Sequence, residues 1–293
     1  MNELAGKVAL ITGGSRGMGR EMALAFARAG ARGVTIAAAP GSDETRDAIA
    51  TELAGVVAEI EAAGGAALPI IADVTVWEDC VAAVEHTVRQ FGALHVLVNN
   101  AGKSQRYHGA RGIPFWETDH DGWRSVIATN TVGPYLMAKA AVPALLAAGW
   151  GRIINVSKHP DQMHEAHTGA YGPSKAALEA QSLSWAEELL DRNVTVNILE
   201  PGGAVNTIFG RGSIRNVGLP ADIIVPAAVW LASERSNGVT GCRFDAKRWD
   251  AALPPDEAAE RCREGPIFPV PVSRTSPLDR AWQPATAPAE VRP

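Results

Sequence analysis

The stretch that decides the fold lies at residues 8–19, which read VALITGGSRGMG. A short apolar run breaks into a glycine-rich turn, and apolar residues recur at helical spacing from Met22 to Ala27. Glycines let the backbone approach a pyrophosphate, and the free N–H groups of a helix start favour its negative charge. The spacing Gly13-x-x-x-Gly17-x-Gly19 differs from the standard fingerprint. Its place between a first strand and helix predicts a dinucleotide site rather than a plain turn.

Composition limits the classes of partner. The chain has 293 residues and a formal net charge of −5 without a Lys/Arg cluster, which argues against nucleic acid and against an acidic membrane surface. No stretch approaches the roughly 20 apolar residues of a membrane span, so we expect a cytoplasmic protein with small-molecule partners. Cys80, Cys242 and Cys262 share no metal-ligand spacing. We therefore expect free thiols and no metal site.

Strand and helix patterns alternate along most of the chain. The alternation predicts one α/β domain over residues 1–245, built on a parallel, doubly wound sheet. Proline and alanine dominate after that point, which predicts an irregular C-terminal extension over residues 246–293, either disordered or laid over the body or a neighbouring subunit. Strands are expected at residues 8–11, 34–39, 67–72, 94–98, 153–156, 194–199 and 239–245.

Cofactor choice depends on the end of the second predicted strand. An acid there holds the ribose 2′-hydroxyl of NAD, whereas a nearby basic residue accommodates the 2′-phosphate of NADP. The strand ends at Ala39 without an acid, and Arg16 lies in the glycine turn. We expect NADP(H) to be preferred and NAD(H) to be possible; the alternative is a solvated turn arginine. Asp73, after the third strand, is predicted to bind the adenine amino group, to cap the next helix, or both.

Tyr171 and Lys175 are four residues apart, so they share one face of a predicted helix. A phenol titrates near pH 10, and moving it about three units towards neutrality takes roughly 4 kcal/mol, which a fixed cation can largely supply. The pair is a candidate proton donor and acceptor for a carbonyl/alcohol couple; the alternative is a solvated helix face. Asn130 lies on the inward stripe of a helix expected from residue 118, so it should have buried partners.

Two loops are candidate substrate elements. The irregular stretch at 103–114 is a candidate substrate-side loop, with a merely solvated loop as the alternative for most of its residues. The stretch at 208–219 is predicted to form a substrate lid. The fourth strand closes on residues 99–102, which read NNAG and suit a polar turn against a bound cofactor.

Taken in order, these landmarks resemble the short-chain dehydrogenase/reductase family over residues 5–245. The resemblance implies a Rossmann-type, doubly wound, seven-stranded parallel sheet, a homodimer or homotetramer, and NAD(P)-dependent interconversion of a secondary alcohol and a ketone. A long insertion after the second strand and the Pro201-to-Thr207 spacing resemble the hydroxysteroid-dehydrogenase-like branch. The landmarks are Thr12-Gly13-x-x-x-Gly17-x-Gly19, Asp73, Asn99-Asn100-Ala101-Gly102, Asn130, a serine after the fifth strand, Tyr171-x-x-x-Lys175 and Pro201-Gly202.

The resemblance also implies roles. Tyr171 would be the general acid/base, Lys175 would lower its pKa and bind the nicotinamide ribose, and Asn130 would hold a proton-relay water near Lys175. The implied catalytic set is Asn130, Ser157, Tyr171 and Lys175. The implied cofactor-binding set is Gly13, Ser15, Arg16, Gly17, Met18, Gly19, Asp73, Val74, Asn100, Ala101, Gly102, Tyr171, Lys175, Pro201, Gly202 and Thr207.

The serine position departs from the family pattern. Most members carry the catalytic serine thirteen residues before the tyrosine, where this chain has Lys158, and Ser157 lies one residue earlier. In one reading the loop shifts by a residue, Ser157 supplies the hydroxyl, and Lys158 turns to solvent or to the cofactor phosphates. In the other, Ser157 points away and the chain is a cofactor-binding sensor or scaffold with weak or no catalysis. We prefer the first reading because the other three catalytic positions are present.

Overall fold

A computed structural model describes residues 2–104, 112–207 and 218–265. The central part of the predicted substrate loop, residues 105–111, and most of the predicted lid, residues 208–217, lie outside the described residues. The same holds for residues 266–293 of the C-terminal extension.

The core is one sheet with the strand order β3-β2-β1-β4-β5-β6-β7-β8. The first seven strands pair in parallel, which confirms the predicted Rossmann-type fold, and an eighth strand that was not expected pairs antiparallel with β7. The chain winds outward in opposite directions from β1 and β4, so a crevice opens at their carboxyl ends, where such sheets bind ligands. The strands are β1 Val8–Thr12, β2 Gly33–Ala38, β3 Ala67–Ile71, β4 Val96–Asn99, β5 Gly151–Val156, β6 Val194–Glu200, β7 Arg243–Asp245 and β8 Arg263–Glu264.

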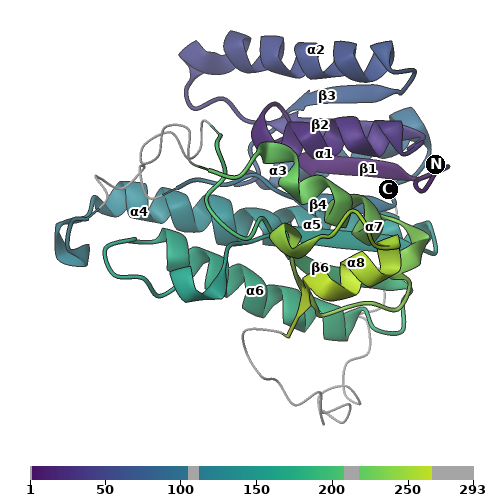
Figure 1. The fold of residues 1–293 in the computed structure, drawn as a ribbon. Helices are drawn as coiled ribbons and strands as arrows, with labels where there is room; N and C mark the ends of the chain where they lie inside the picture. The colour runs from purple at the N-terminus through teal and green to yellow at the C-terminus, as the bar shows by residue number, and fades with distance from the viewer. Residues whose placement is uncertain (1, 105–111, 208–217, 266–293) are drawn as a thin grey trace, which may run out of the picture.

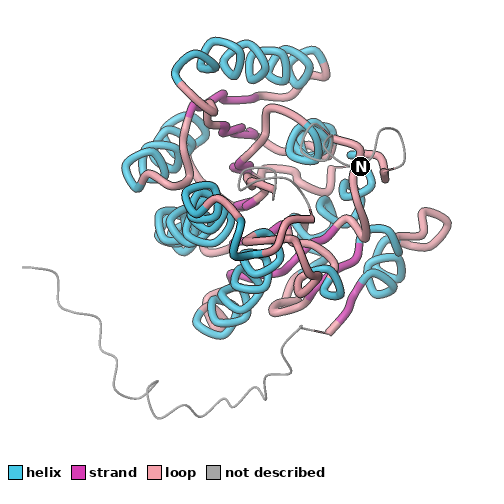
Figure 2. The backbone as a smooth tube through the Cα atoms, turned by 90° about the vertical axis from the view of Figure 1, so that its left-hand side faces the viewer, coloured by secondary structure: helices cyan, strands magenta, loops and turns pink. Residues whose placement is uncertain are grey.

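Helices cover both faces of the sheet, as Figures 1 and 2 show. Ala9 and Ile11 pack into one hydrophobic cluster and Leu10 into the other, because successive side chains of a strand point to opposite faces. Burial on both faces explains why the strands read as continuous apolar runs. Helices α1 Gly17–Arg28, α2 Arg46–Ala62 and α7 Val225–Ala232 contribute to the first cluster, and α3 Trp77–Phe91, α5 Gly133–Ala147 and α6 Tyr171–Glu188 to the second.

The long helix expected from residue 118 is built in three parts. Helix α4, His120–Ile127, runs through a π-helical turn, Ala128–Val132, into α5. Wider turns of this kind are frequent at functional sites. Asn130 lies within the π-helical turn, where its side chain is fully buried.

The prediction that the chain is irregular from residue 246 is wrong for residues 246–264. A short 3₁₀ turn, Ala246–Arg248, is followed by α8, Pro255–Cys262, and then by β8. Two of the prolines that suggested irregularity, Pro254 and Pro255, stand at the start of α8, where the missing N–H costs no helical hydrogen bond. Ala259 and Cys262 are buried in the first cluster, and the indole of Trp230 donates to Asp256 Oδ1 over 2.8 Å. This part of the extension therefore belongs to the domain.

The loop between β5 and α6 packs tightly over the first turn of α6. It contains a short 3₁₀ turn, Pro160–Gln162, and then passes Gly172. A Cβ atom on Gly172 would lie 2.1 Å from the carbonyl oxygen of Met163, a distance that forces the loop to move. Glycine at this position therefore lets the loop lie beside Tyr171.

Replacement of Gly172 by alanine is expected to destabilise the protein. The added methyl group must displace backbone rather than a flexible side chain, so Gly172→Ala should lower the free energy of unfolding by about 1–3 kcal/mol. Gly55→Ala is the matched control, because Gly55 lies in α2 with open space around it and should gain about 0.5–1 kcal/mol. Urea unfolding measures both changes; equal stability of Gly172→Ala and wild type would contradict the packing.

Candidate active site

The glycine turn is compressed between β1 and β4. Gly13 and Gly17 adopt left-handed φ angles of 65° and 56°, which favour glycine. A Cβ atom on Gly19 would lie 2.2 Å from the Gly13 carbonyl oxygen and 2.5 Å from Asn100 Nδ2. The Asn100 amide donates to the carbonyl oxygens of Thr12 and Gly13 over 2.9 and 3.1 Å. The predicted polar turn after β4 therefore holds the glycine turn in place.

The start of α1 has the character of an anion site. Its first turn carries no acidic residue, and its N-cap residue, Arg16, makes no side-chain capping bond. The first N–H groups of a helix have no partners within it and attract negative charge. A Cβ atom on Gly17 would lie 3.1 Å from Thr207 Cγ2, so the predicted contact residue Thr207 lies over this turn. The residues present thus fit the pyrophosphate of a dinucleotide.

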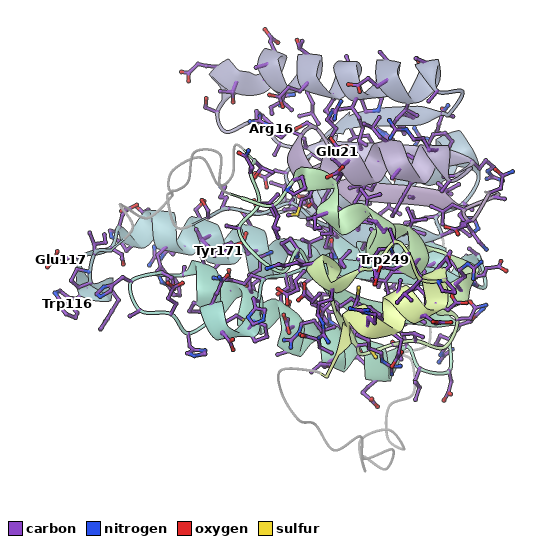
Figure 3. All side chains as sticks on the ribbon, in the orientation of Figure 1. Arg16, Glu21, Trp116, Glu117, Tyr171 and Trp249 are labelled. Carbon is purple, nitrogen blue, oxygen red and sulfur yellow. The ribbon has the colours of Figure 1, made fainter. Side chains whose placement is uncertain are left out.

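Arg16 and Asp73 have partners of their own. Arg16 Nε donates to Glu52 Oε2 on α2 over 2.9 Å, and both side chains are partly exposed. Figure 3 places Arg16 beside the start of α1. Asp73 Oδ1 accepts from the backbone N–H and the hydroxyl of Thr75, each over 2.8 Å. Asp73 therefore stabilises the turn before α3, and its contact with adenine stays a prediction.

Other members of the predicted cofactor set lie at the same edge of the sheet. Val74 is buried after β3, and Gly202, after β6, adopts a φ of 80°. A Cβ atom on Gly202 would lie 2.2 Å from Asp245 Oδ1, so the backbone of this turn packs directly against the Asp245 side chain. Ala101 follows β4 and donates its N–H to Thr12 Oγ1 over 3.0 Å.

Tyr171 is the first residue of α6 (Figure 3). Lys175 lies one turn further along the same helix. Lys175 is buried, and its Nζ donates to the Val156 carbonyl at the end of β5 over 2.7 Å. Burial lowers the pKa of Lys175 to about 8, and nearby Glu179 opposes this shift. Burial also raises the pKa of Tyr171 to about 12. The lowering of the Tyr171 pKa by Lys175 therefore stays a prediction.

Asn130 has the buried partners that its position requires. Its Oδ1 accepts from the Lys103 backbone N–H over 2.7 Å, and its Nδ2 donates to the Lys103 carbonyl over 2.8 Å and to Ser174 Oγ over 3.0 Å. The side chain thereby joins the segment after β4 to the first turn of α6. Its role in holding a relay water stays a prediction.

Ser157 and Lys158 have different partners. Ser157 is buried and its hydroxyl donates to Glu179 Oε1 over 2.7 Å. Lys158 Nζ lies 5.1 Å from the centre of the Tyr171 ring and donates to the Gln162 carbonyl over 2.9 Å. Which of the two side chains faces the substrate therefore stays a prediction, although the Ser157 hydroxyl is bonded to Glu179 in this structure. The buried carboxyl group of Glu179 draws the serine hydroxyl towards α6.

Glu179 belongs to a buried group of ionisable side chains beneath the site. Arg243 Nη1 lies 3.5 Å from Glu179 Oε2, and Arg243 Nη2 lies 3.0 Å from Glu264 Oε2. Burial raises the pKa of Glu179 to about 7; burial and then Asp245 raise that of Glu200 to about 8. Both carboxyl oxygens of Glu200 lack a hydrogen-bond partner among the described residues. Sequence reasoning missed Glu179, although it follows Lys175 by four residues on the same helix face.

A cavity of about 420 Å³ adjoins this end of α6. Aromatic and apolar side chains line it, together with His164 and His167. Gly169 and Pro173, on either side of Tyr171 in the chain, also form part of its wall. The apolar lining includes Phe115, Trp116, Trp123 and Met163.

Across residues 2–104, 112–207 and 218–265, no group of three or more His, Cys, Asp or Glu side chains is placed to hold a metal ion. The three cysteines are free and buried, as expected. Within the same residues, every helix is too short or too polar to cross a membrane.

The raised pKa of Glu200 predicts a pH-dependent stability. Between its ordinary value of 4.5 and about 8, the folded protein keeps a proton that the unfolded chain releases, so the free energy of unfolding falls as pH rises through this window. Glu200→Gln cannot ionise and should flatten that fall. Urea unfolding at pH 5 and pH 8 measures the slope, with exposed Glu61→Gln as control. An unchanged slope in Glu200→Gln would contradict the buried neutral carboxyl group.

Comparison with known proteins identifies the family. The short chain dehydrogenase family model matches residues 7–212. The chain belongs to this oxidoreductase family. It is 37% identical over 255 residues to 2,5-dichloro-2,5-cyclohexadiene-1,4-diol dehydrogenase LinX from Sphingobium indicum, covering 82% of this chain and 94% of the relative. It is 30% identical over 250 residues to 3-oxoacyl-[acyl-carrier-protein] reductase FabG from Thermotoga maritima, covering 81% and 95%.

Two solved structures of dehydrogenases that share the fold contain a nicotinamide cofactor. Carveol dehydrogenase from Mycobacterium avium, in complex with NAD, matches with a TM-score of 0.72 and 26% identity over 84% of this chain and 98% of its own. A short chain dehydrogenase from Shigella flexneri, complexed with NADP, matches with a TM-score of 0.73 and 27% identity over 84% and 99%. The narrower resemblance to the hydroxysteroid-dehydrogenase-like branch stays a prediction.

Proposed function

We propose that this protein interconverts a secondary alcohol and a ketone with NAD(P) and uses Tyr171 as the general acid/base. The observation that carries the proposal is the placement of Tyr171 and buried Lys175 at the strand ends, on the edge that also bears the glycine turn. The dehydrogenase and reductase names of the relatives, and the NAD and NADP complexes of the structural neighbours, support this reaction class.

In the proposed reaction, Tyr171, Lys175 and Asn130 have different roles. A bound nicotinamide would supply or accept the hydride. In reduction the Tyr171 hydroxyl gives its proton to the carbonyl oxygen, and in oxidation it takes the proton back. Lys175 stabilises the phenolate by charge, and its hydrogen bond to Val156 fixes the ammonium one turn from Tyr171. Asn130 anchors the backbone of Lys103 against α6 and so supports the same wall of the site.

A cofactor-binding sensor or scaffold with weak or no catalysis is the second candidate. Two observations favour it: Lys158 stands where most of the family carries the catalytic serine, and the hydroxyl of the neighbouring Ser157 is bonded to Glu179. This alternative predicts tight NADP(H) binding without hydride transfer across a broad panel of carbonyl compounds.

Tyr171→Phe tests the main proposal. Loss of the proton donor should lower kcat by a factor of about 10² to 10⁴, with NADPH binding retained. The assay is the loss of NADPH absorbance with a panel of carbonyl compounds, and exposed Tyr135→Phe on α5 is the matched control. An unchanged rate in Tyr171→Phe would contradict the acid/base role. Tight cofactor binding without turnover by the wild type would support the sensor.

We also propose that NADP(H) is preferred over NAD(H). The end of β2 carries no acid to hold a ribose 2′-hydroxyl, and Arg16 stands at the start of α1. Its ion pair with Glu52 holds the guanidinium between α1 and α2. A homodimer or homotetramer in the cytoplasm is proposed from the family resemblance.

Arg16→Ala tests the cofactor preference. A charge-assisted hydrogen bond contributes about 1.5 kcal/mol or more, so its loss should weaken NADPH binding by about tenfold and leave NADH binding nearly unchanged. Glu52→Gln removes the competing carboxylate and should tighten NADPH binding instead. Titration of cofactor fluorescence gives the dissociation constants. Tighter binding of NADH than of NADPH by the wild type would contradict the role of Arg16.

A further inference from the structure

Lys158 occupies the position that faces the proposed acid/base. Its backbone follows β5 by two residues, and its ammonium group lies 5.1 Å from the centre of the Tyr171 ring. The hydrogen bond to the Gln162 carbonyl holds the ammonium within the loop that covers the start of α6. The positive charge also reaches Lys175, where it contributes to the lowered pKa. Lys158 is therefore close to both members of the Tyr171–Lys175 pair.

The Ser157 hydroxyl is bonded to Glu179 rather than to Tyr171 or Lys175. The serine side chain is 4% exposed, and its hydroxyl donates to Glu179 Oε1 over 2.7 Å. The other oxygen of Glu179 has no hydrogen bond among the described residues, although Arg243 lies 3.5 Å away. Turning Ser157 towards a substrate would leave a fully buried carboxyl group without its hydrogen-bond donor, which is unfavourable.

We propose that Lys158, in place of a serine, is the catalytic residue that holds the reacting oxygen of the substrate together with Tyr171. This inference rests on the proposed function and deepens it. An ammonium group donates hydrogen bonds as a hydroxyl does and adds a positive charge. Because negative charge develops on the reacting oxygen during hydride transfer, a fixed cation stabilises the transition state more than a neutral donor does.

The step balances without a further reactant. In the direction of reduction, a bound reduced nicotinamide would supply the hydride for the new C–H bond, and the π pair of the carbonyl would move onto oxygen. The oxygen then takes the proton of the Tyr171 hydroxyl. The ketone is reduced and the nicotinamide is oxidised, while Lys158 keeps its protons and contributes hydrogen bonding and charge.

The surroundings of Lys158 also indicate a substrate class. Met163, next to Gln162 in the chain, lines the 420 Å³ cavity together with Phe115, Trp116 and Trp123. Gly169 and Pro173, two residues before and after Tyr171 in the chain, also line this cavity. The inference therefore includes a substrate with an apolar body that packs against this lining while its reacting oxygen meets Lys158 and Tyr171.

Substitutions at both positions test the inference in the full-length protein. Lys158→Met should lower kcat by a factor of about 10² to 10³, the range for loss of one charge-stabilising donor, with NADPH affinity within about twofold of wild type. Lys158→Arg keeps the charge and should retain more activity than Lys158→Met. Ser157→Ala should lower kcat by less than about tenfold. Thermal unfolding of each variant identifies losses that come from misfolding rather than from chemistry.

The possible outcomes separate this inference from the proposed function. If Ser157→Ala abolishes turnover and Lys158→Met does not, the inference is overturned while the acid/base role of Tyr171 stands. If Lys158→Ser, which restores the residue usual in the family, exceeds the wild-type rate, lysine is an impediment and the inference is also overturned. If the wild type binds NADPH but turns over no carbonyl compound, both proposals fail. The expected order of kcat is wild type, then Lys158→Arg, then Lys158→Met.

Discussion

The hydrogen bond from the Lys175 ammonium to the Val156 carbonyl joins α6 to the end of β5, and the geometry of the site depends on it. A buried ammonium needs a close acceptor, because an unpaired buried charge is strongly unfavourable. With Lys175 fixed at the strand end, Tyr171 must lie one turn earlier at the mouth of the same crevice, and Glu179 one turn deeper. A single contact thus sets the positions of three ionisable groups relative to the sheet.

Burial then gives these groups unusual protonation equilibria. It brings the pKa of Lys175 down to about 8 and raises that of Glu179 to about 7, so both groups titrate close to neutrality. Burial raises the pKa of the Tyr171 phenol to about 12, whereas removal of a proton from an alcohol requires a lower pKa. Tyr171 therefore carries its proton at neutral pH, which is the state from which the proposed donation to a ketone starts.

Much of this arrangement was predictable from local pattern. The glycine turn at 13–19, the alternation of strands and helices, and the inward position of Asn130 each follow from spacing along the chain. The orientation of Ser157 and Lys158 was not predictable from the sequence. Adjacent side chains at a strand end point to opposite sides, and which of the two points towards α6 depends on the hydrogen bond to Glu179, twenty-two residues away in sequence. Helix α8 was missed because prolines at a helix start resemble prolines that exclude a helix.

The central claim is that the buried carboxyl group of Glu179 holds Ser157 and leaves Lys158 to meet the substrate. A crystal structure of the wild-type protein with NADP⁺ and a bound alcohol tests it most directly. The account predicts Lys158 Nζ and Tyr171 Oη within hydrogen-bond distance of the substrate oxygen, with Ser157 Oγ still on Glu179. A structure in which Ser157 Oγ contacts that oxygen, and Lys158 points to solvent, would contradict it.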